Sequence, residues 1–190
     1  MFFVYIIYII MYTEWSYNFF NVSAIKGIAE GLNKINFFNK EPIVLCIGSD
    51  LVLGDSLGPL VGTLVKQMGC NFYVYGTLNS TVTAKEMIYV KNYLSKLHPN
   101  SFLIVVDAAI GEEKDVGLIK LLKYGIRPGK GVDKNFEEIG DASIIGVVAS
   151  KSLKNYNLFK STRLNVVYQM AEKIACGIKH YLKEYKKGTI

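Results

Sequence analysis

The sequence predicts an α/β fold, a three-layer α/β/α sandwich around a mostly parallel mixed sheet. Short, continuously apolar runs alternate along the chain with segments whose apolar residues recur at helical spacing. The last apolar runs follow one another too closely for helical crossovers, which predicts an antiparallel or hairpin portion and hence a mixed sheet. With 190 residues, 51% of them hydrophobic, the chain has the size of one domain and enough apolar surface to fold.

The first part of the domain predicts a helix, a strand and a second helix. Apolar residues recur at helical spacing over 25–35, with charged residues on the other face. The run 43–47 is continuously apolar, as expected for a strand buried on both faces. Pro59 is tolerated only in the first turn of a helix, so the second helix should begin near Asp55 or Ser56.

The middle of the chain predicts a strand, a helix and another strand. A short apolar strand is expected at 72–75. The sequence T-A-K-E at 83–86 is a capping box, which opens a helix that ends near Leu97. The apolar strand 102–106 runs directly into Asp107.

The last part predicts two strands and a long helix. The strands are expected at 116–124 and 144–149, separated by a loop at 125–141 that is rich in glycine and charge. The final helix should be capped by Ser161 or Thr162 and end near Tyr185.

The N-terminus begins with an apolar run, MFFVYIIYIIMY at 1–12. It is shorter than the roughly 20 residues that span a bilayer, and the first basic residue is Lys26, so we expect no stable membrane insertion and no signal peptide. Three interpretations remain open: an over-extended start with initiation at Met11, an arm that packs on the body or a partner, and a weak membrane anchor. We therefore divide the chain into an N-terminal arm at 1–24 and a single domain at 25–190.

Charge and cysteine content limit the classes of function. The net charge is +6 and no long basic run occurs, so we expect no nucleic-acid partner. The three cysteines are an odd number without C-x-x-C spacing, which indicates a reducing, cytoplasmic compartment. With two histidines and scattered cysteines, a structural zinc site is not expected.

Two aspartates are the candidate catalytic residues. In open α/β sheets ligands bind outside the carboxyl ends of the strands, where Asp107 follows one strand and Asp55 lies in the loop after another. Two close carboxylates share a proton, so that one acts as base and the other as acid, and such a pair can activate water for amide hydrolysis. Asp55 could instead be a simple N-cap and Asp107 could tighten a turn. Asp50, in the same loop, is either a third member or solvated.

Other catalytic patterns are absent or weak. Gly48, Gly54 and Gly58 match neither the dinucleotide fingerprint nor the P-loop. No G-x-S-x-G elbow exists for a serine hydrolase, and His98 and His180 are expected to be structural or solvated.

We expect substrate contacts from five residues. Gly54, Ser56 and Gly58 surround Asp55 in its loop, and Arg127 and Lys130 lie in the glycine-rich loop, from which they could steer an anionic group. The alternative for the two basic residues is simple solvation.

The sequence resembles the YyaC-type sporulation proteins, a family regarded as candidate spore proteases. The resemblance covers residues 42–182 and rests on CIGSDLVLGDSLGPLVG at 46–62, VDA at 106–108, RPGKGV at 127–132, GD at 140–141 and TRL at 162–164. The sequence is also similar to the wider superfamily that holds the germination protease of spore-formers and the hydrogenase maturation endopeptidases. That resemblance implies the phosphorylase/hydrolase-like α/β/α fold.

The resemblance also implies a function. In the germination protease the catalytic aspartates occupy positions that match Asp55 and Asp107. We therefore expect an atypical aspartic endopeptidase of sporulation or germination, without cofactor, in the cytoplasm of the forespore or spore core. Its substrate would be a protein or peptide, with small acid-soluble spore proteins as candidates, and a homo-oligomer is left open.

Two alternatives accompany this interpretation. One is a non-catalytic sporulation factor that binds a peptide or protein in the same place. The other is a nickel-dependent maturation endopeptidase, in which the two acids and a later loop histidine hold the metal. After Asp107 the next histidine is His180, which speaks against nickel, and no metal ligand is assigned.

Overall fold

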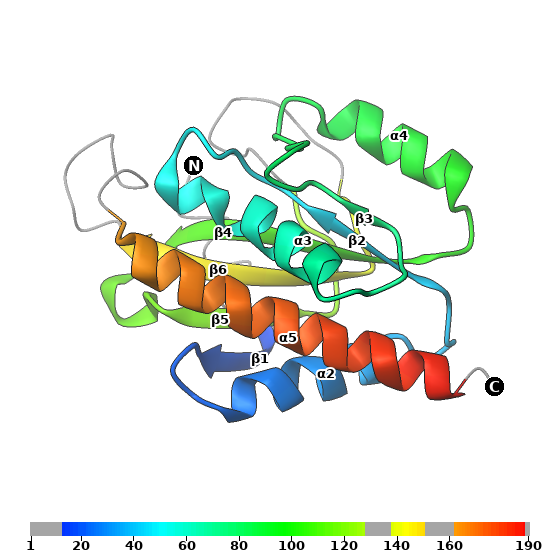
Figure 1. Cartoon of the computed structure of the whole chain (residues 1–190), viewed down its shortest axis with the longest axis horizontal. Coiled ribbons are helices and arrows are strands. Elements are labelled where there is room, and N and C mark those ends of the chain that lie inside the picture. Colours follow the sequence, from blue (N-terminus) through cyan, green and yellow to red (C-terminus); the bar gives the residue numbers. More distant parts are fainter. Residues whose placement is uncertain (1–12, 128–137, 151–161, 189–190) are drawn as a thin grey trace.

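A computed structural model describes residues 13–127, 138–150 and 162–188. Six strands form one sheet in the order β1-β5-β6-β4-β2-β3 (Figure 1). The strands are β1 Thr13–Asn18, β2 Pro42–Cys46, β3 Val74–Tyr75, β4 Phe102–Gly111, β5 Leu118–Leu122 and β6 Ala142–Ser150. The helices are α2 Ser23–Ile35, α3 Leu57–Gln67, α4 Met87–Leu97 and α5 Leu164–Gly188, with short 3-10 turns η1 Leu53–Ser56 and η2 Glu113–Asp115.

The sheet is mixed, as the sequence predicts. Strands β3, β2, β4 and β6 pair in parallel, whereas β5 runs antiparallel to both β6 and β1. Only residues 112–117, which include η2, separate β4 from β5, and this link is too short for a helical crossover. Gly117 has a φ of +92°, the left-handed conformation that glycine adopts readily in such a tight turn.

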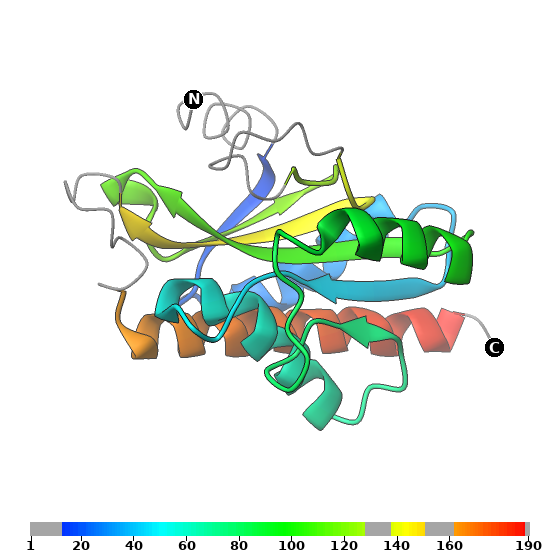
Figure 2. The ribbon, with the colours of Figure 1, turned by 90° about the horizontal axis from the view of Figure 1, so that it is seen from above.

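Helices cover both faces of the sheet. Figure 2 shows α2, α3 and α5 on one side and α4 on the other. Alternate residues of the strands feed two separate buried clusters, because side chains alternate between the faces of a strand. On β4, for example, Ile104 and Val106 face the α3–α5 layer and Val105 faces the α4 layer. The prediction of a three-layer α/β/α sandwich is confirmed.

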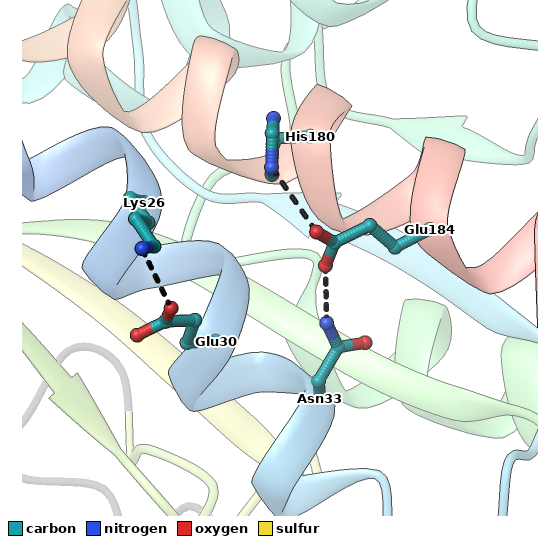
Figure 3. Close-up of polar contacts among 5 residues, drawn as sticks. All are labelled: Lys26, Glu30, Asn33, His180 and Glu184. Atoms are coloured by element: carbon teal, nitrogen blue, oxygen red, sulfur yellow. Dashed lines mark hydrogen bonds and ion pairs between the residues drawn. The ribbon is translucent and has the colours of Figure 1, made fainter.

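Helix α5 packs along α2 and α3 through an apolar stripe. Its buried Tyr181 accepts a hydrogen bond from Asn36 Nδ2 at 2.7 Å, just beyond the end of α2. Nearer the surface, Glu184 contacts His180 at 3.1 Å and accepts a hydrogen bond from Asn33 of α2 (Figure 3). His180 therefore lies at a helix–helix boundary with its side chain half exposed, which fits the prediction that it is structural or solvated.

The first strand is not predicted from the sequence. Residues 13–18, counted above with the N-terminal arm, form β1 and pair with β5 at the edge of the sheet. Trp15 and Tyr17 alternate with polar residues and pack against the α2 side of the core, which is the period-2 signal of a half-buried strand. The interpretations of residues 1–12 lie outside the described residues. No helix in the described part of the chain is long and apolar enough to cross a membrane.

Several predicted boundaries need correction. Strand β4 continues to Gly111 instead of ending at Val106, because β6 pairs with it beyond the end of β2. The capping-box residue Glu86 does accept a hydrogen bond from the Thr83 N–H, at 2.7 Å, but α4 begins only at Met87.

Two apolar residues at helix ends are exposed. Leu97, at the last position of α4, is 50% exposed. Leu164, at the first position of α5, is 59% exposed. Both lie at helix ends that extend beyond the buried core.

Candidate active site

The two candidate catalytic aspartates are carried by neighbouring strands. β2 and β4 pair in parallel up to Cys46 and Val106, so their carboxyl ends lie side by side. Asp107 is the first residue of β4 beyond that pairing. Asp55 lies in η1, at the end of the loop that leaves β2. Both carboxylates therefore stand at the carboxyl end of the parallel strands, where open α/β sheets bind ligands.

The loop between β2 and η1 is held closed by backbone contacts. The Ser49 N–H donates to the Asp55 carbonyl oxygen at 3.2 Å, and the Ser49 hydroxyl accepts from the Leu51 N–H at 3.2 Å. Gly48 has a φ of +142°, and a Cβ there would lie 2.0 Å from the Asp55 carbonyl oxygen. Gly48 thus lets η1 approach the end of β2 closely enough to fix Asp55 in place.

Glycine also brings α3 against β2. A Cβ on Gly58 would lie 2.0 Å from the Ile47 carbonyl oxygen, and one on Gly62 would lie 2.0 Å from the Gly76 carbonyl oxygen. Gly76 itself has a φ of +79° and stands against the Cys46 carbonyl. Backbone packing thus accounts for Gly48, Gly58 and Gly62 of the 46–62 motif.

The pKa of Asp107 lies well above its usual range. Desolvation is the largest cause, the charge of Asp55 adds to it, and a hydrogen bond from the Ala108 N–H to Asp107 Oδ1, at 2.8 Å, works in the opposite direction. Burial also raises the pKa of Asp55, against a backbone hydrogen bond from Ser49 that lowers it. The charge of Asp55 therefore acts on Asp107, and Asp107 is the carboxyl that keeps its proton more strongly.

The remaining predicted site residues differ in their surroundings. Gly54 and Gly58 are buried, and Ser56 is buried with its hydroxyl donating to the Leu53 carbonyl oxygen at 2.6 Å. Arg127 is exposed, and among the described residues it forms no hydrogen bond or ion pair with either aspartate. Lys130 lies outside the described residues. Substrate contact by these five residues stays a prediction.

Asp50, Cys46 and His98 form no hydrogen bond or ion pair with either candidate catalytic aspartate among the described residues. Asp50 is exposed in the loop before η1, in agreement with the solvated alternative. Cys46 is fully buried, and burial raises the pKa of its thiol far above neutrality, so it serves as core packing. His98 Nε2 lies 2.7 Å from the Tyr75 hydroxyl, next to the edge strand β3.

A buried ion pair that the sequence does not predict lies on the same sheet face as Asp107. Lys120 of β5 pairs in register with Ile145 of β6, which pairs with Asp107, and paired residues project to the same face. Lys120 Nζ lies 2.9 Å from Asp115 Oδ2 of η2, and both side chains are almost fully buried. The sequence signal is a single lysine inside an otherwise apolar strand.

The described residues offer few ligands for a metal. Within 13–127, 138–150 and 162–188, no three His, Cys, Asp or Glu side chains gather as a metal site would require. Nickel normally needs such a set, usually including His or Cys. The pair Asp55 and Asp107 by itself suits proton sharing better than tight binding of nickel.

Comparison with known proteins identifies the family. Residues 17–177 match the family model described as "Protein of unknown function (DUF1256)". The chain belongs to this family. A curated relative, the uncharacterized protein YyaC of Bacillus subtilis (strain 168), is 44% identical over 140 residues, which cover 73% of this chain and 68% of the relative. The predicted kinship with the YyaC-type proteins is confirmed.

One solved structure has a similar but not closely superimposable fold. It is the [NiFe] hydrogenase maturation protease HycI from Thermococcus kodakarensis KOD1, with a TM-score of 0.48 and 17% identity, covering 76% of this chain and 93% of that chain.

Proposed function

We propose that this protein is an atypical aspartic endopeptidase in which Asp55 and Asp107 together activate water. The observation that carries the proposal is the influence of the Asp55 charge on the pKa of Asp107. Two aspartates that each only cap a helix or a turn would not change each other's pKa in this way, whereas an acid–base pair depends on such an effect. The position of both residues at the carboxyl end of β2 and β4 supports the same conclusion.

The two aspartates take different roles. Asp107 holds its proton to higher pH and is the general acid, while ionised Asp55 is the general base. Asp55 accepts a proton from water as the water oxygen attacks the peptide carbonyl carbon, and Asp107 donates its proton to the carbonyl oxygen. The C–N bond then breaks as the leaving nitrogen takes up the proton held by Asp55, and Asp107 takes back a proton from one hydroxyl of the intermediate, which leaves the carboxylic acid product and restores the pair.

The substrate belongs to the same proposal. The kinship with YyaC-type proteins motivates a role in sporulation or germination, with small acid-soluble spore proteins as substrates and the cytoplasm of the forespore or spore core as the site of action. A non-catalytic factor that only binds such a protein is the competing function.

A cleavage assay tests the proposal. Purified protein is incubated with small acid-soluble spore proteins, with and without a chelator, and fragments are followed by mass spectrometry. We expect discrete cleavage that survives the chelator and is lost in Asp55→Asn and Asp107→Asn. Asp50→Asn, which changes an exposed acid of the same loop, is the matched control and should keep full activity.

The other outcomes distinguish the alternatives. Binding of the spore proteins without cleavage would support the non-catalytic factor. Activity that stops with the chelator and returns with nickel would support a metal-dependent endopeptidase and contradict the aspartic mechanism.

A further inference from the structure

The open edge of the sheet beside β3 carries a groove. It is lined by residues 72–77 together with Lys66, Ser80 and Val82, and it encloses about 310 Å³. We call this feature the β3 groove. β3 is the last strand of the sheet, after β2, so no further strand of the described chain covers it (Figure 1).

The backbone of β3 is arranged to pair with another extended chain. The Val44 N–H donates to the Tyr73 carbonyl oxygen at 2.9 Å, and Val44 stands opposite Val74 in the parallel ladder. Because successive residues of a strand direct their backbone groups to opposite sides, the N–H and C=O of Val74 point away from β2, toward the open edge of the sheet. An extended peptide that adds to this edge satisfies both groups.

Lysines gather at one end of the groove. Lys66 lines it directly, and Lys186 Nζ lies 4.9 Å from the centroid of the Phe72 ring. Burial raises the pKa of the nearby Cys70 thiol, and Lys183 and Lys186 lie close enough to it for their positive charges to oppose this larger effect. Lys66, Lys183 and Lys186 are exposed and define what we call the lysine patch. A segment with acidic residues at this end would match its charge.

The other end of the groove meets the loop that carries Asp55. Val82 forms an isolated parallel bridge with Ile47, and its carbonyl oxygen accepts a hydrogen bond from the Gly48 N–H at 2.9 Å. Gly48 is followed by Ser49, which contacts Asp55. The groove therefore runs from the lysine patch toward the candidate active site.

We propose that the β3 groove binds an extended acidic segment of the protein substrate as an added β-strand, with its acidic residues on the lysine patch. This inference rests on the proposed function for the identity of the occupant, but the binding itself requires no catalysis. The substrate is then a protein with an unfolded, acidic stretch beside the bond to be cleaved.

Binding is measured with the Asp55→Asn protein, so that no cleavage interferes. The probe is a fluorescein-labelled peptide of about ten residues that alternates valine and threonine and carries glutamates at its N-terminal or its C-terminal end. One control peptide carries lysines in place of the glutamates, and another carries N-methyl groups on alternate backbone amides. Fluorescence anisotropy gives the dissociation constants, and hydrogen exchange locates the bound peptide.

A groove that acts by strand addition predicts a defined pattern. Lys66→Glu with Lys186→Glu should weaken binding at least about tenfold, because both charges are reversed at one end of the groove. The control Lys26→Glu with Lys114→Glu changes the net charge equally at exposed positions of α2 and η2, which contact β1, β5 and β6 rather than β3, and it should change binding less than about twofold. N-methylation should also cost at least about tenfold, and backbone amides at 72–77 should exchange more slowly when the acidic peptide is bound.

Three results would overturn the inference: no binding of either acidic peptide, equal binding by the groove and control variants, or protection from exchange only outside 70–82. Failure of the cleavage assay with the spore proteins would refute the proposed endopeptidase while leaving a positive binding result intact. Cleavage that persists unchanged in Lys66→Glu with Lys186→Glu would refute the groove and leave the endopeptidase.

Discussion

The charge of Asp55, in the η1 turn, raises the pKa of Asp107 on the neighbouring strand β4. This relationship depends on two structural features. β2 and β4 are adjacent and parallel, and the loop after β2 folds back so that Ser49 bonds the Asp55 backbone. Asp107, which is costly to ionise, therefore lies at the end of the sheet where ligands bind, and such acids are typical of functional sites.

Asp107→Asn should stabilise the protein at neutral pH. Because the folded-state pKa of Asp107 is raised, the folded state binds more protons than the unfolded state once the pH exceeds the unfolded value of about 4, and stability falls as the pH rises toward the folded pKa. The amide has no charge to bury and can still accept the Ala108 hydrogen bond. Thermal melts should show a higher Tm for the variant at about pH 7 and no difference near pH 4. A variant that is less stable than the wild type at both pH values would contradict this.

Gly58→Ala should destabilise the fold. Its new Cβ would lie 2.0 Å from the Ile47 carbonyl oxygen, and backbone on both sides must move to relieve the clash. Overpacking of this kind costs about 1–3 kcal/mol. Urea denaturation measures the loss. Gly188→Ala, at a position with no neighbouring atom within 4 Å, is the control and should stay within about 0.5 kcal/mol of the wild type.

Breaking the Lys120–Asp115 pair on one side should cost more than removing both charges. Asp115→Asn leaves the buried Lys120 without its counter-ion, a change worth about 3–5 kcal/mol in buried pairs. Replacing both residues with Lys120→Met and Asp115→Leu removes the unpaired charge, so the double variant should recover most of the loss. Free energies of unfolding from urea titrations give the comparison, and a double variant less stable than Asp115→Asn would contradict it.

The sheet and its helices could be predicted because buried parallel strands are continuously apolar. The runs at 43–47 and 102–106 correspond to β2 and the first half of β4. β1 was missed because it is an edge strand with one packed face, so only Trp15 and Tyr17 signal it. The short alternation of apolar and polar residues over 13–18 is a weaker sequence signal than the continuous apolar run at 1–12 that precedes it.

The acidic pair could be located from the sequence, but its energetics could not. Asp55 and Asp107 follow from strand ends and from the family motif, whereas the effect of the Asp55 charge on the pKa of Asp107 depends on how far the η1 turn folds back. A single lysine in the apolar strand β5 is the sequence signal of the Lys120–Asp115 pair, but it does not identify the partner. The groove depends on β3 being the last strand of the sheet, which no local pattern in the sequence specifies.

The central claim is that Asp55 and Asp107 titrate as one pair. A direct measurement is the titration of ¹³C-labelled aspartate carboxyls by NMR in the wild type, Asp55→Asn and the control Asp50→Asn. The Asp107 resonance should titrate well above the usual aspartate range in the wild type and in Asp50→Asn, and at lower pH once Asp55→Asn removes the neighbouring charge. An Asp107 pKa in the ordinary range, or one that Asp55→Asn leaves unchanged, would contradict the claim.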